Sequence, residues 1–316
     1  MKLLKMFFLI ISLLTLSHSW GQDVNLDLAQ AANDFNAIFS NRLEKIKEGS
    51  RPFIMLHDKK GPTVLMFHGL SDSPGSMKEV ANIYFKHGYN VLTVLLRDHG
   101  LLSDYRRDIR DQITLQNWRE DIDQYMKVAL SLSDSNKISL IGFSLGGALI
   151  LDTTHRYEGK INSLVFLAPL FKMNHEWAIP ASKFLRHVLY STSKGIKETA
   201  HFYPNITLNQ TYQAYKLTKY IKKNITQEPT SELLAIPKLM FLTDADSTIE
   251  NKYAYKVAEL LQLDSNQIVT YTNDQQETTV LHRDLPMRFI NASGAMNPHI
   301  DDLLKRLDNF LAAHDR

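Results

Sequence analysis

The sequence predicts an α/β fold in which a mostly parallel sheet is covered by helices on both faces and carries a helical lid insertion. Short apolar runs, such as residues 63–67 and 91–96, alternate with helical segments along most of the chain. These runs are almost entirely apolar, which is typical of strands buried on both faces. The stretch between the strand ending near residue 168 and the next, starting near residue 237, is too long for a plain crossover. An insertion is therefore expected there.

The first half of the chain alternates helices and strands. The elements expected there are a helix over 26–47, a strand over 63–67, a helix over 77–87, a strand over 91–96 and a helix over 115–132. Apolar residues from Leu28 to Ile46 recur near helical spacing. Gly88 lies where the second helix should stop. Trp118 and its helical neighbours give the third helix one apolar face.

The second half continues this alternation around the insertion. The elements expected there are strands over 137–141, 163–168, 237–243 and 267–271 and helices over 148–156, 249–261 and 298–313. The predicted core is therefore built from residues 20–170 and 233–316. Residues 171–232, rich in aromatic side chains, form the predicted lid.

Residues 1–19 are expected to be a secretory signal peptide and not part of the fold. Lys2 and Lys5 precede an apolar run that ends in small residues. The run is shorter than the roughly 20 apolar residues that span a bilayer. Cleavage after Ser19 fits best, with a site after Gly21 as the alternative. We expect a periplasmic or secreted protein; the competing interpretation is an uncleaved, membrane-anchoring helix.

Composition bounds the function. The 316 residues include 44% hydrophobic and 22% charged side chains, as in ordinary globular proteins. The net charge of +2 gives no argument for a nucleic-acid partner. The absence of cysteine excludes disulfides, thiolate metal sites and a cysteine nucleophile. We find neither metal-ligand nor nucleotide-binding spacing, so no metal and no cofactor are expected.

The motif Gly142-Phe-Ser144-Leu-Gly146 predicts a nucleophilic serine. It lies between an apolar strand and a helix of small residues, the context in which this turn exposes a serine above a sheet. Glycines flank the turn because it leaves little room for side chains. The alternative is a glycine-rich turn without chemistry.

A loop containing His68 and Gly69 follows the first strong strand. Such a loop can direct the backbone N–H of Leu70 at a developing oxyanion, with the N–H of Leu145 as second donor. His68 itself could be catalytic, but a histidine at a strand end more often supports its loop. We expect the supporting role.

Together these motifs resemble those of α/β-hydrolases. The pieces, in chain order, are His68-Gly-Leu-Ser-Asp-Ser-Pro74, Arg97-Asp-His-Gly100, Trp118 and Gly142-Phe-Ser-Leu-Gly-Gly147. Over about residues 60–313 the chain looks like the bacterial carboxylesterase and monoacylglycerol-lipase branch. This resemblance implies a serine–acid–histidine triad, a lid and no cofactor. One departure is Asp-His-Gly after Arg97, where related sequences often have Pro-Gly-His-Gly.

The resemblance also implies the other two triad members. The family's acid follows the strand after the lid, a position that Asp246 matches better than Asp244. The family's histidine comes last, which favours His282 over His299, a residue near the start of the final helix. In these roles His282 takes the serine proton and Asp246 orients its ring.

We therefore expect hydrolysis of small acyl-ester or lipid substrates through an acyl-enzyme intermediate. One alternative is a proline-iminopeptidase-like peptidase, although the lid holds only four acidic side chains against nine basic ones. The other is a non-catalytic binding protein on the same scaffold. The basic lid also suggests weak contact with anionic membrane surfaces. Its aromatic side chains, among them Trp177 and Phe184, either line an acyl pocket or pack the lid onto the core.

Overall fold

The computed structural model describes residues 20–102, 110, 112–174, 176, 179, 189–191, 199, 201–203, 205–273, 279–290 and 293–314, with backbone alone for 20–25, 189–191 and 205. The predicted leader, Trp177 and Phe184 lie outside the described residues. Within the described ranges, no helix combines the length and apolar content needed to cross a membrane.

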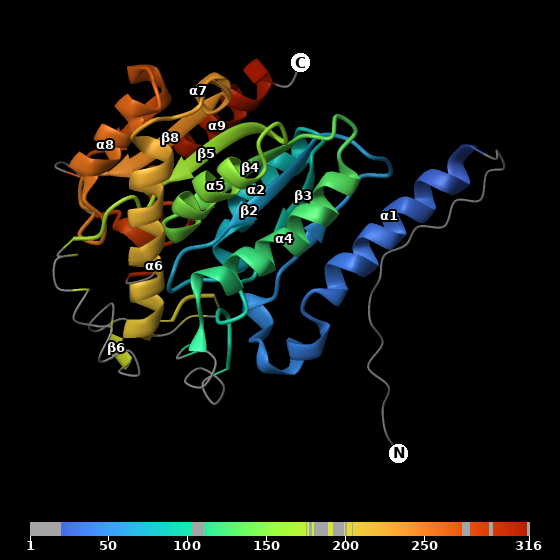
Figure 1. Cartoon of the computed structure of the whole chain (residues 1–316), viewed down its shortest axis with the longest axis horizontal. Coiled ribbons are helices and arrows are strands. Elements are labelled where there is room, and N and C mark those ends of the chain that lie inside the picture. The colour runs from blue at the N-terminus through green and yellow to red at the C-terminus, as the bar shows by residue number, and fades with distance from the viewer. Residues whose placement is uncertain are drawn as a thin grey trace.

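A seven-stranded sheet forms the centre of the molecule (Figure 1). Its spatial order is β1-β3-β2-β4-β5-β8-β9, and every neighbouring pair is parallel except β1 with β3. The strands are β1 (Ile54–Met55), β2 (Thr63–Phe67), β3 (Asn90–Thr93), β4 (Ile138–Phe143), β5 (Ile161–Leu167), β8 (Lys238–Thr243) and β9 (Ile268–Tyr271). Every residue of β2, β4 and β8 is buried, which explains why these segments are mostly apolar in sequence.

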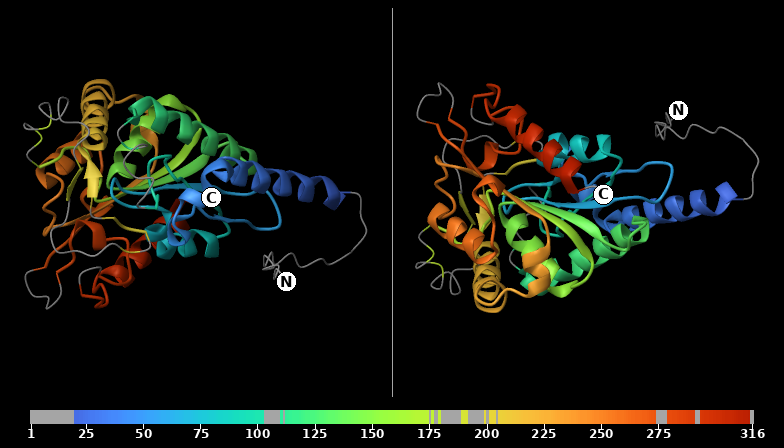
Figure 2. Two further views of the ribbon diagram at one scale, coloured as in Figure 1. Left: turned by 90° about the horizontal axis from the view of Figure 1, so that it is seen from below. Right: turned by 90° about the horizontal axis from the view of Figure 1, so that it is seen from above.

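Helices cover both faces of this sheet (Figure 2). On one face α4 and α5 pack against the central strands, and on the other α2 and α9 pack together; α1 lies along α4. The helices of the core are α1 (Trp20–Ala37), α2 (Lys78–Lys86), α4 (Leu115–Leu132), α5 (Leu145–Arg156), α8 (Asn251–Leu260) and α9 (Ile300–His314). The predicted fold class, a mostly parallel sheet with helices on both faces, is confirmed.

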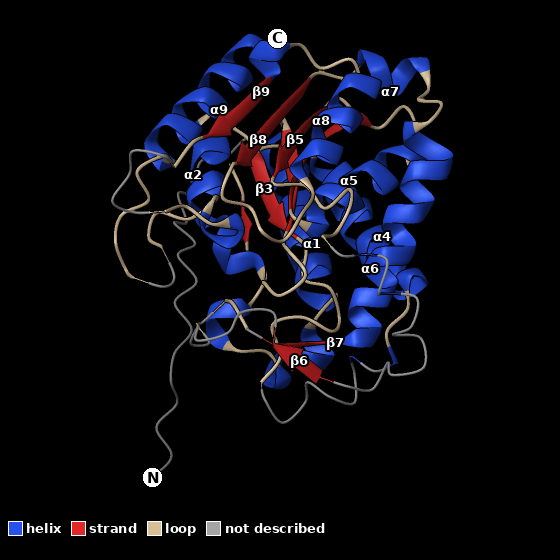
Figure 3. Cartoon of the chain, turned by 90° about the vertical axis from the view of Figure 1, so that its left-hand side faces the viewer, coloured by secondary structure: helices blue, strands red, loops and turns tan. Residues whose placement is uncertain are grey.

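The segment between β5 and β8 contains elements of its own. They are β6 (Leu189–Ser191), β7 (Asn205–Thr207), α6 (Leu208–Ile221), a π-helical turn (Lys222–Thr226) and α7 (Ser231–Ala235). The β6–β7 pair lies apart from the main sheet (Figure 3). A capping box starts α6, because Thr207 Oγ1 accepts from Gln210 N while the Gln210 side chain accepts from Thr207 N.

One local prediction was wrong, and one strand was missed. The helix expected over 26–47 starts at Trp20, ends at Ala37 and is followed by a 3₁₀ helix, Ser40–Lys45. Ile46 pairs instead with Leu101 in an antiparallel bridge, so its burial arises from a distant partner and not from helical periodicity. The two-residue strand β1 was not predicted, because so short an edge strand has no pattern to detect.

Candidate active site

The sheet gathers the predicted site residues at one edge. Ser144 follows β4, Asp246 follows β8 and His282 follows β9 along the chain, while Leu70 follows β2. Because these strands are parallel, their carboxyl ends all reach the same edge of the sheet. The side chains that come after them can therefore meet, although 138 residues separate Ser144 from His282.

Ser144 occupies a strained turn between β4 and α5. Its φ of 54° and ψ of −115° are a backbone conformation that few non-glycine residues adopt. A Cβ at Gly142 would overlap the backbone of Gly146, and one at Gly146 would overlap the backbone of Phe67. Glycine is thus required at both places, because strand and helix approach each other there without room for a methyl group. The turn is held by bonds from Leu170 N and Gly147 N to the Ser144 carbonyl, at 2.8 and 2.9 Å.

A continuous chain of hydrogen bonds joins the three predicted residues. The Ser144 hydroxyl lies 2.7 Å from Nε2 of His282, and Nδ1 of His282 lies 2.5 Å from Oδ2 of Asp246. With Asp246 as a carboxylate acceptor, the consistent tautomer has its proton on Nδ1, which leaves Nε2 to accept the serine proton. Ser144 is only 5% exposed and His282 only 8% exposed, so little water competes for these bonds.

Asp246 is kept ionised by its partners. Burial opposes the charge, but the nearby His282 and the N–H groups of Ile249 and Thr248, 3.0 and 2.8 Å from Oδ1, outweigh it and lower the pKa of Asp246 below its ordinary value. The rival carboxylate, Asp244, is exposed and instead accepts hydrogen bonds from Asn273.

The rival histidine lies elsewhere. His299 stacks on Tyr271 of β9, with ring centroids 4.6 Å apart. Burial lowers its pKa, and its backbone N–H donates to Asn297 Oδ1 just before α9. The structure therefore brings Ser144 together with His282 and not with His299.

The two predicted oxyanion donors belong to the two segments that adjoin Ser144. Leu145 opens α5, so its N–H has no acceptor within the helix and lies at the positive end of the helix dipole. Leu70 lies in the loop after β2, which neighbours β4 in the sheet. Gly69 and Leu70 line the same pocket as Ser144.

His68 supports this loop. Its Nδ1–H donates to the Gly69 carbonyl at 2.8 Å, and its Nε2 accepts from Leu96 N at 3.4 Å. Burial, reinforced by the nearby His99, lowers the pKa of His68 to about 3, so the ring stays neutral while it holds both groups. This is the supporting role expected from its position.

A cavity of about 420 Å³ opens beside Ser144 and His282. Its wall is largely apolar and comes from both the core and the insertion. The insertion and its entry contribute Leu170, Met173, Asn174, Ile179, Phe202, Ile206 and Thr211. Tyr212, Tyr215 and Tyr220 pack against the hydrophobic core instead, which is the packing role weighed for the aromatic residues.

Two charged residues at this cavity were missed by sequence reasoning. Asp72 is 5% exposed and lines the cavity. Burial raises the pKa of Asp72 to about 7, against the opposing influence of Ser76, Ser73 N–H and His282. Arg283 also lines the cavity, and burial lowers its pKa despite the neighbouring Asp284. Asp72 lies within the motif that begins at His68, but nothing local signals its burial.

The described residues contain no cluster of three or more His, Asp or Glu side chains suited to hold a metal ion. The reactive side chains that the site brings together are a serine, a histidine and a carboxylate, joined in that order by hydrogen bonds.

Known proteins resemble this chain in sequence and fold. The model of a family described as serine aminopeptidase, S33, matches residues 58–226. Human monoglyceride lipase is 25% identical over 252 residues, covering 71% of this chain and 78% of that protein.

Two solved structures illustrate the fold. A soluble variant of Saccharomyces cerevisiae monoglyceride lipase, in complex with a substrate analog, has a TM-score of 0.66 at 14% identity, covering 83% of this chain and 91% of its own. Paleococcus ferrophilus monoacylglycerol lipase has a TM-score of 0.62 at 15% identity, covering 84% of this chain and 98% of its own. The predicted α/β-hydrolase fold is therefore confirmed.

Proposed function

This chain belongs to the serine aminopeptidase S33 family of α/β-hydrolases, and from that membership we propose that it is a serine esterase with Ser144, His282 and Asp246 as its triad. It is a hydrolase of the carboxylesterase and lipase type. The observation that carries the triad is the unbroken hydrogen-bond chain of 2.7 and 2.5 Å in the wall of the cavity.

The first half of the reaction transfers the acyl group to the enzyme. As Ser144 Oγ bonds to the ester carbonyl carbon, its proton passes to Nε2 of His282. The carbonyl oxygen becomes an oxyanion that accepts from the N–H groups of Leu70 and Leu145. Collapse of this intermediate breaks the bond to the alkoxide, which takes the proton from Nε2 and leaves as an alcohol.

The second half returns the enzyme to its starting state. Water attacks the acyl carbon while Nε2 of His282 accepts its proton. The bond to Ser144 Oγ then breaks, the oxygen recovers a proton from His282, and a carboxylic acid leaves. Asp246 remains ionised throughout, which its lowered pKa favours, and stabilises the imidazolium formed in each half.

The cavity favours a medium acyl chain over acetate. Its volume of about 420 Å³ lies in the range of small-molecule sites, roughly 300–1,000 Å³. An acetyl group would leave most of the wall wet, whereas each buried methylene contributes about 0.8 kcal/mol. A lipid ester also agrees with the similarity of this chain to monoglyceride lipases.

A panel of p-nitrophenyl esters of rising chain length, run beside aminoacyl p-nitroanilides, tests this proposal. We expect kcat/KM to rise from acetate to a medium chain and the anilides to be poor substrates. A serine-directed fluorophosphonate should label the wild type but not Ser144→Ala. His282→Ala should abolish turnover, and His299→Ala should not. An unlabelled wild type without esterase activity would instead support a non-catalytic binding protein.

A peptidase is the second candidate. The matching family is described by an aminopeptidase activity, and Asp72 places a carboxyl group in the cavity where a substrate ammonium could bind. In that case aminoacyl p-nitroanilides would be better substrates than any ester. Asp72→Asn would then weaken anilide hydrolysis more than ester hydrolysis.

We further propose export and a weak membrane contact. The basic leader residues, short apolar run and small residues before Trp20 support a signal peptide. N-terminal sequencing of protein from a periplasmic or culture fraction should find a start near Trp20 or Gln22, whereas an intact Met1 in the membrane pellet would contradict export. The excess of basic residues in the insertion supports binding to anionic vesicles that weakens with salt. Vesicles ignored even at low salt would exclude this contact.

A further inference from the structure

The loop that carries the Leu70 N–H is bound to a short segment of the insertion. We call residues 69–73 the oxyanion loop. Tyr203 Oη donates to the Leu70 carbonyl and Tyr203 N to the Ser71 carbonyl, each at 3.0 Å. Ser73 Oγ donates to the His201 carbonyl at 2.7 Å. Three hydrogen bonds thus join two short segments that lie 128 to 133 residues apart in sequence.

Hydrogen bonds from the core and from the insertion fix the peptide planes on the two sides of Leu70. The Gly69 carbonyl shares a trans peptide plane with the Leu70 N–H, and it accepts from His68 Nδ1 at 2.8 Å and from Asp72 N at 3.3 Å. The N–H therefore points away from these donors. The next plane carries the Leu70 carbonyl, which Tyr203 Oη holds. Core and insertion each fix one of the two planes that set the direction of the Leu70 N–H.

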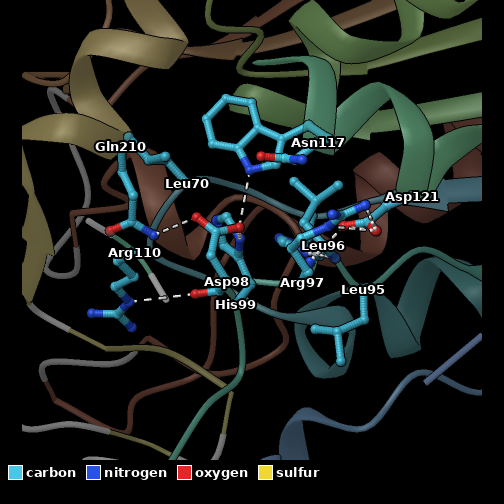
Figure 4. A network of polar contacts seen from close by, with 12 residues as sticks. Leu70, Leu95, Leu96, Arg97, Asp98, His99, Arg110, Asn117, Asp121 and Gln210 are labelled. Carbon is cyan, nitrogen blue, oxygen red and sulfur yellow. Dashed lines mark hydrogen bonds and ion pairs between the residues drawn. The ribbon is translucent and has the colours of Figure 1, made fainter. Parts of the chain in front are cut away.

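Tyr203 is itself held in place. It is 1% exposed, and the Arg110 guanidinium lies 4.1 Å from its ring centroid. Arg110 Nε donates to the Asp98 carbonyl at 3.4 Å (Figure 4). The tyrosine ring thus packs on a charged group that belongs to a larger buried network.

The centre of this network is the Asp98 carboxylate (Figure 4). It accepts from His99 Nδ1 at 2.7 Å, from Trp118 Nε1 of α4 at 2.9 Å and from Gln210 Nε2 of α6 at 2.8 Å. Burial opposes its charge, but these three hydrogen bonds and the electrostatic interaction with His99 hold the pKa of Asp98 below its ordinary range. Gln210 also caps α6, so one side chain ties the start of that helix to the core.

We propose that Tyr203 is a positioning residue for ester hydrolysis: through its hydroxyl and its amide, the insertion holds the oxyanion loop so that the Leu70 N–H faces the developing oxyanion. The inference rests on the proposed function, because it concerns the transition state of that reaction. It gives the insertion a part in the chemical step in addition to its part in lining the cavity.

Tyr203→Phe tests this with little loss of packing, since it removes the hydroxyl alone. Outright removal of an oxyanion donor costs about 10²–10³-fold in kcat, so a donor that is misdirected should cost about tenfold. We expect kcat for a p-nitrophenyl ester to fall about tenfold, with KM changed less than twofold. Inhibition by an alkyl trifluoromethyl ketone, which forms an oxyanion on Ser144, should weaken by a similar factor.

Tyr125→Phe is the matched control. Tyr125 is fully buried in α4 and donates to a backbone carbonyl, that of Leu95, at 3.5 Å. Tyr125→Phe therefore removes the same kind of buried hydroxyl group, but at a place outside the oxyanion loop. Its kcat should stay within twofold of wild type. Ser73→Ala, which removes the bond to His201, should lower kcat in the same direction as Tyr203→Phe.

Hydrogen exchange followed by mass spectrometry supplies a readout that does not need turnover. Peptides covering the oxyanion loop should exchange faster in Tyr203→Phe than in wild type or Tyr125→Phe. Unchanged loop exchange, or a raised KM with an unchanged kcat, would overturn the proposal. A wild type without esterase activity would overturn the proposed function instead, and the loop exchange would still decide whether Tyr203 holds the loop.

Discussion

Replacing Asp72 by Asn should stabilise the protein at pH 8 and change its stability little at pH 4. Burial raises the pKa of Asp72 from an ordinary 3.8 to about 7 in the folded chain. Well below pH 4 the Asp72 carboxyl is protonated in both the folded and the unfolded chain, so its burial costs no stability. Between pH 4 and 7 the unfolded chain ionises and the folded chain does not, so stability falls as pH rises.

The size of the effect follows from these two values. Each pH unit between them corresponds to 1.36 kcal/mol, so the full loss is at most about 4 kcal/mol and is complete above pH 7. Asn removes the titration, and its Oδ1 can still accept from Ser73 N, as Asp72 Oδ1 does at 2.8 Å. The free energy of unfolding of Asp72→Asn should therefore exceed that of wild type by an amount that grows from near zero at pH 4 toward this limit at pH 8.

Urea unfolding of both proteins at half-unit steps from pH 4 to 8.5, at constant ionic strength, measures the difference directly. Ser76→Ala adds an internal check, because the Ser76 hydrogen bond lowers the pKa of Asp72 in the folded chain. Its loss should raise the pH at which the fall in stability is complete, while the lower limit of the pH window stays the same. A stability difference that is the same at pH 4.5 and 8.5 would show that Asp72 titrates normally and that the reasoning from its burial is wrong.

Three further outcomes follow from the geometry. Ser144→Ala should lower kcat by roughly a million-fold, the scale for a triad nucleophile, without lowering the urea midpoint; substantial residual turnover would remove Ser144 from the mechanism. Asp246→Ala should lower kcat less than Ser144→Ala does, but far more than Asp244→Ala, because the Asp244 side chain bonds to Asn273 and not to His282. If steady-state assays give the reverse order for the two aspartates, their roles are exchanged. Phe35→Ala should cost about 3–5 kcal/mol of stability, because the ring is 1% exposed; an unchanged midpoint would mean that α1 is not part of the cooperative fold.

Local sequence patterns were sufficient for the parallel strands of the sheet and for the turn that carries Ser144. Mostly apolar runs identify β2, β4 and β8 because strands covered on both faces place nearly all of their side chains in the core. Gly142 and Gly146 flank Ser144 because the backbone approach at that turn excludes a side chain. These constraints act within a few residues, so they are visible without the fold.

The rest of the candidate site depends on contacts between distant parts of the chain. Asp244 and Asp246 are two residues apart and chemically identical; the family resemblance favoured Asp246, and in the structure Asp246 bonds to the His282 ring whereas Asp244 bonds to Asn273. The charge state of Asp72 depends on burial by segments that no local pattern reveals. Tyr203 was one aromatic residue among many in the insertion until the fold placed its hydroxyl on the Leu70 carbonyl. Sequence by itself determined the turn that carries Ser144, because local geometry restricts residue type there, and the family resemblance indicated the strands that Asp246 and His282 follow. Tertiary structure alone decided which groups meet, because hydrogen bonds and burial depend on proximity in space and not along the chain.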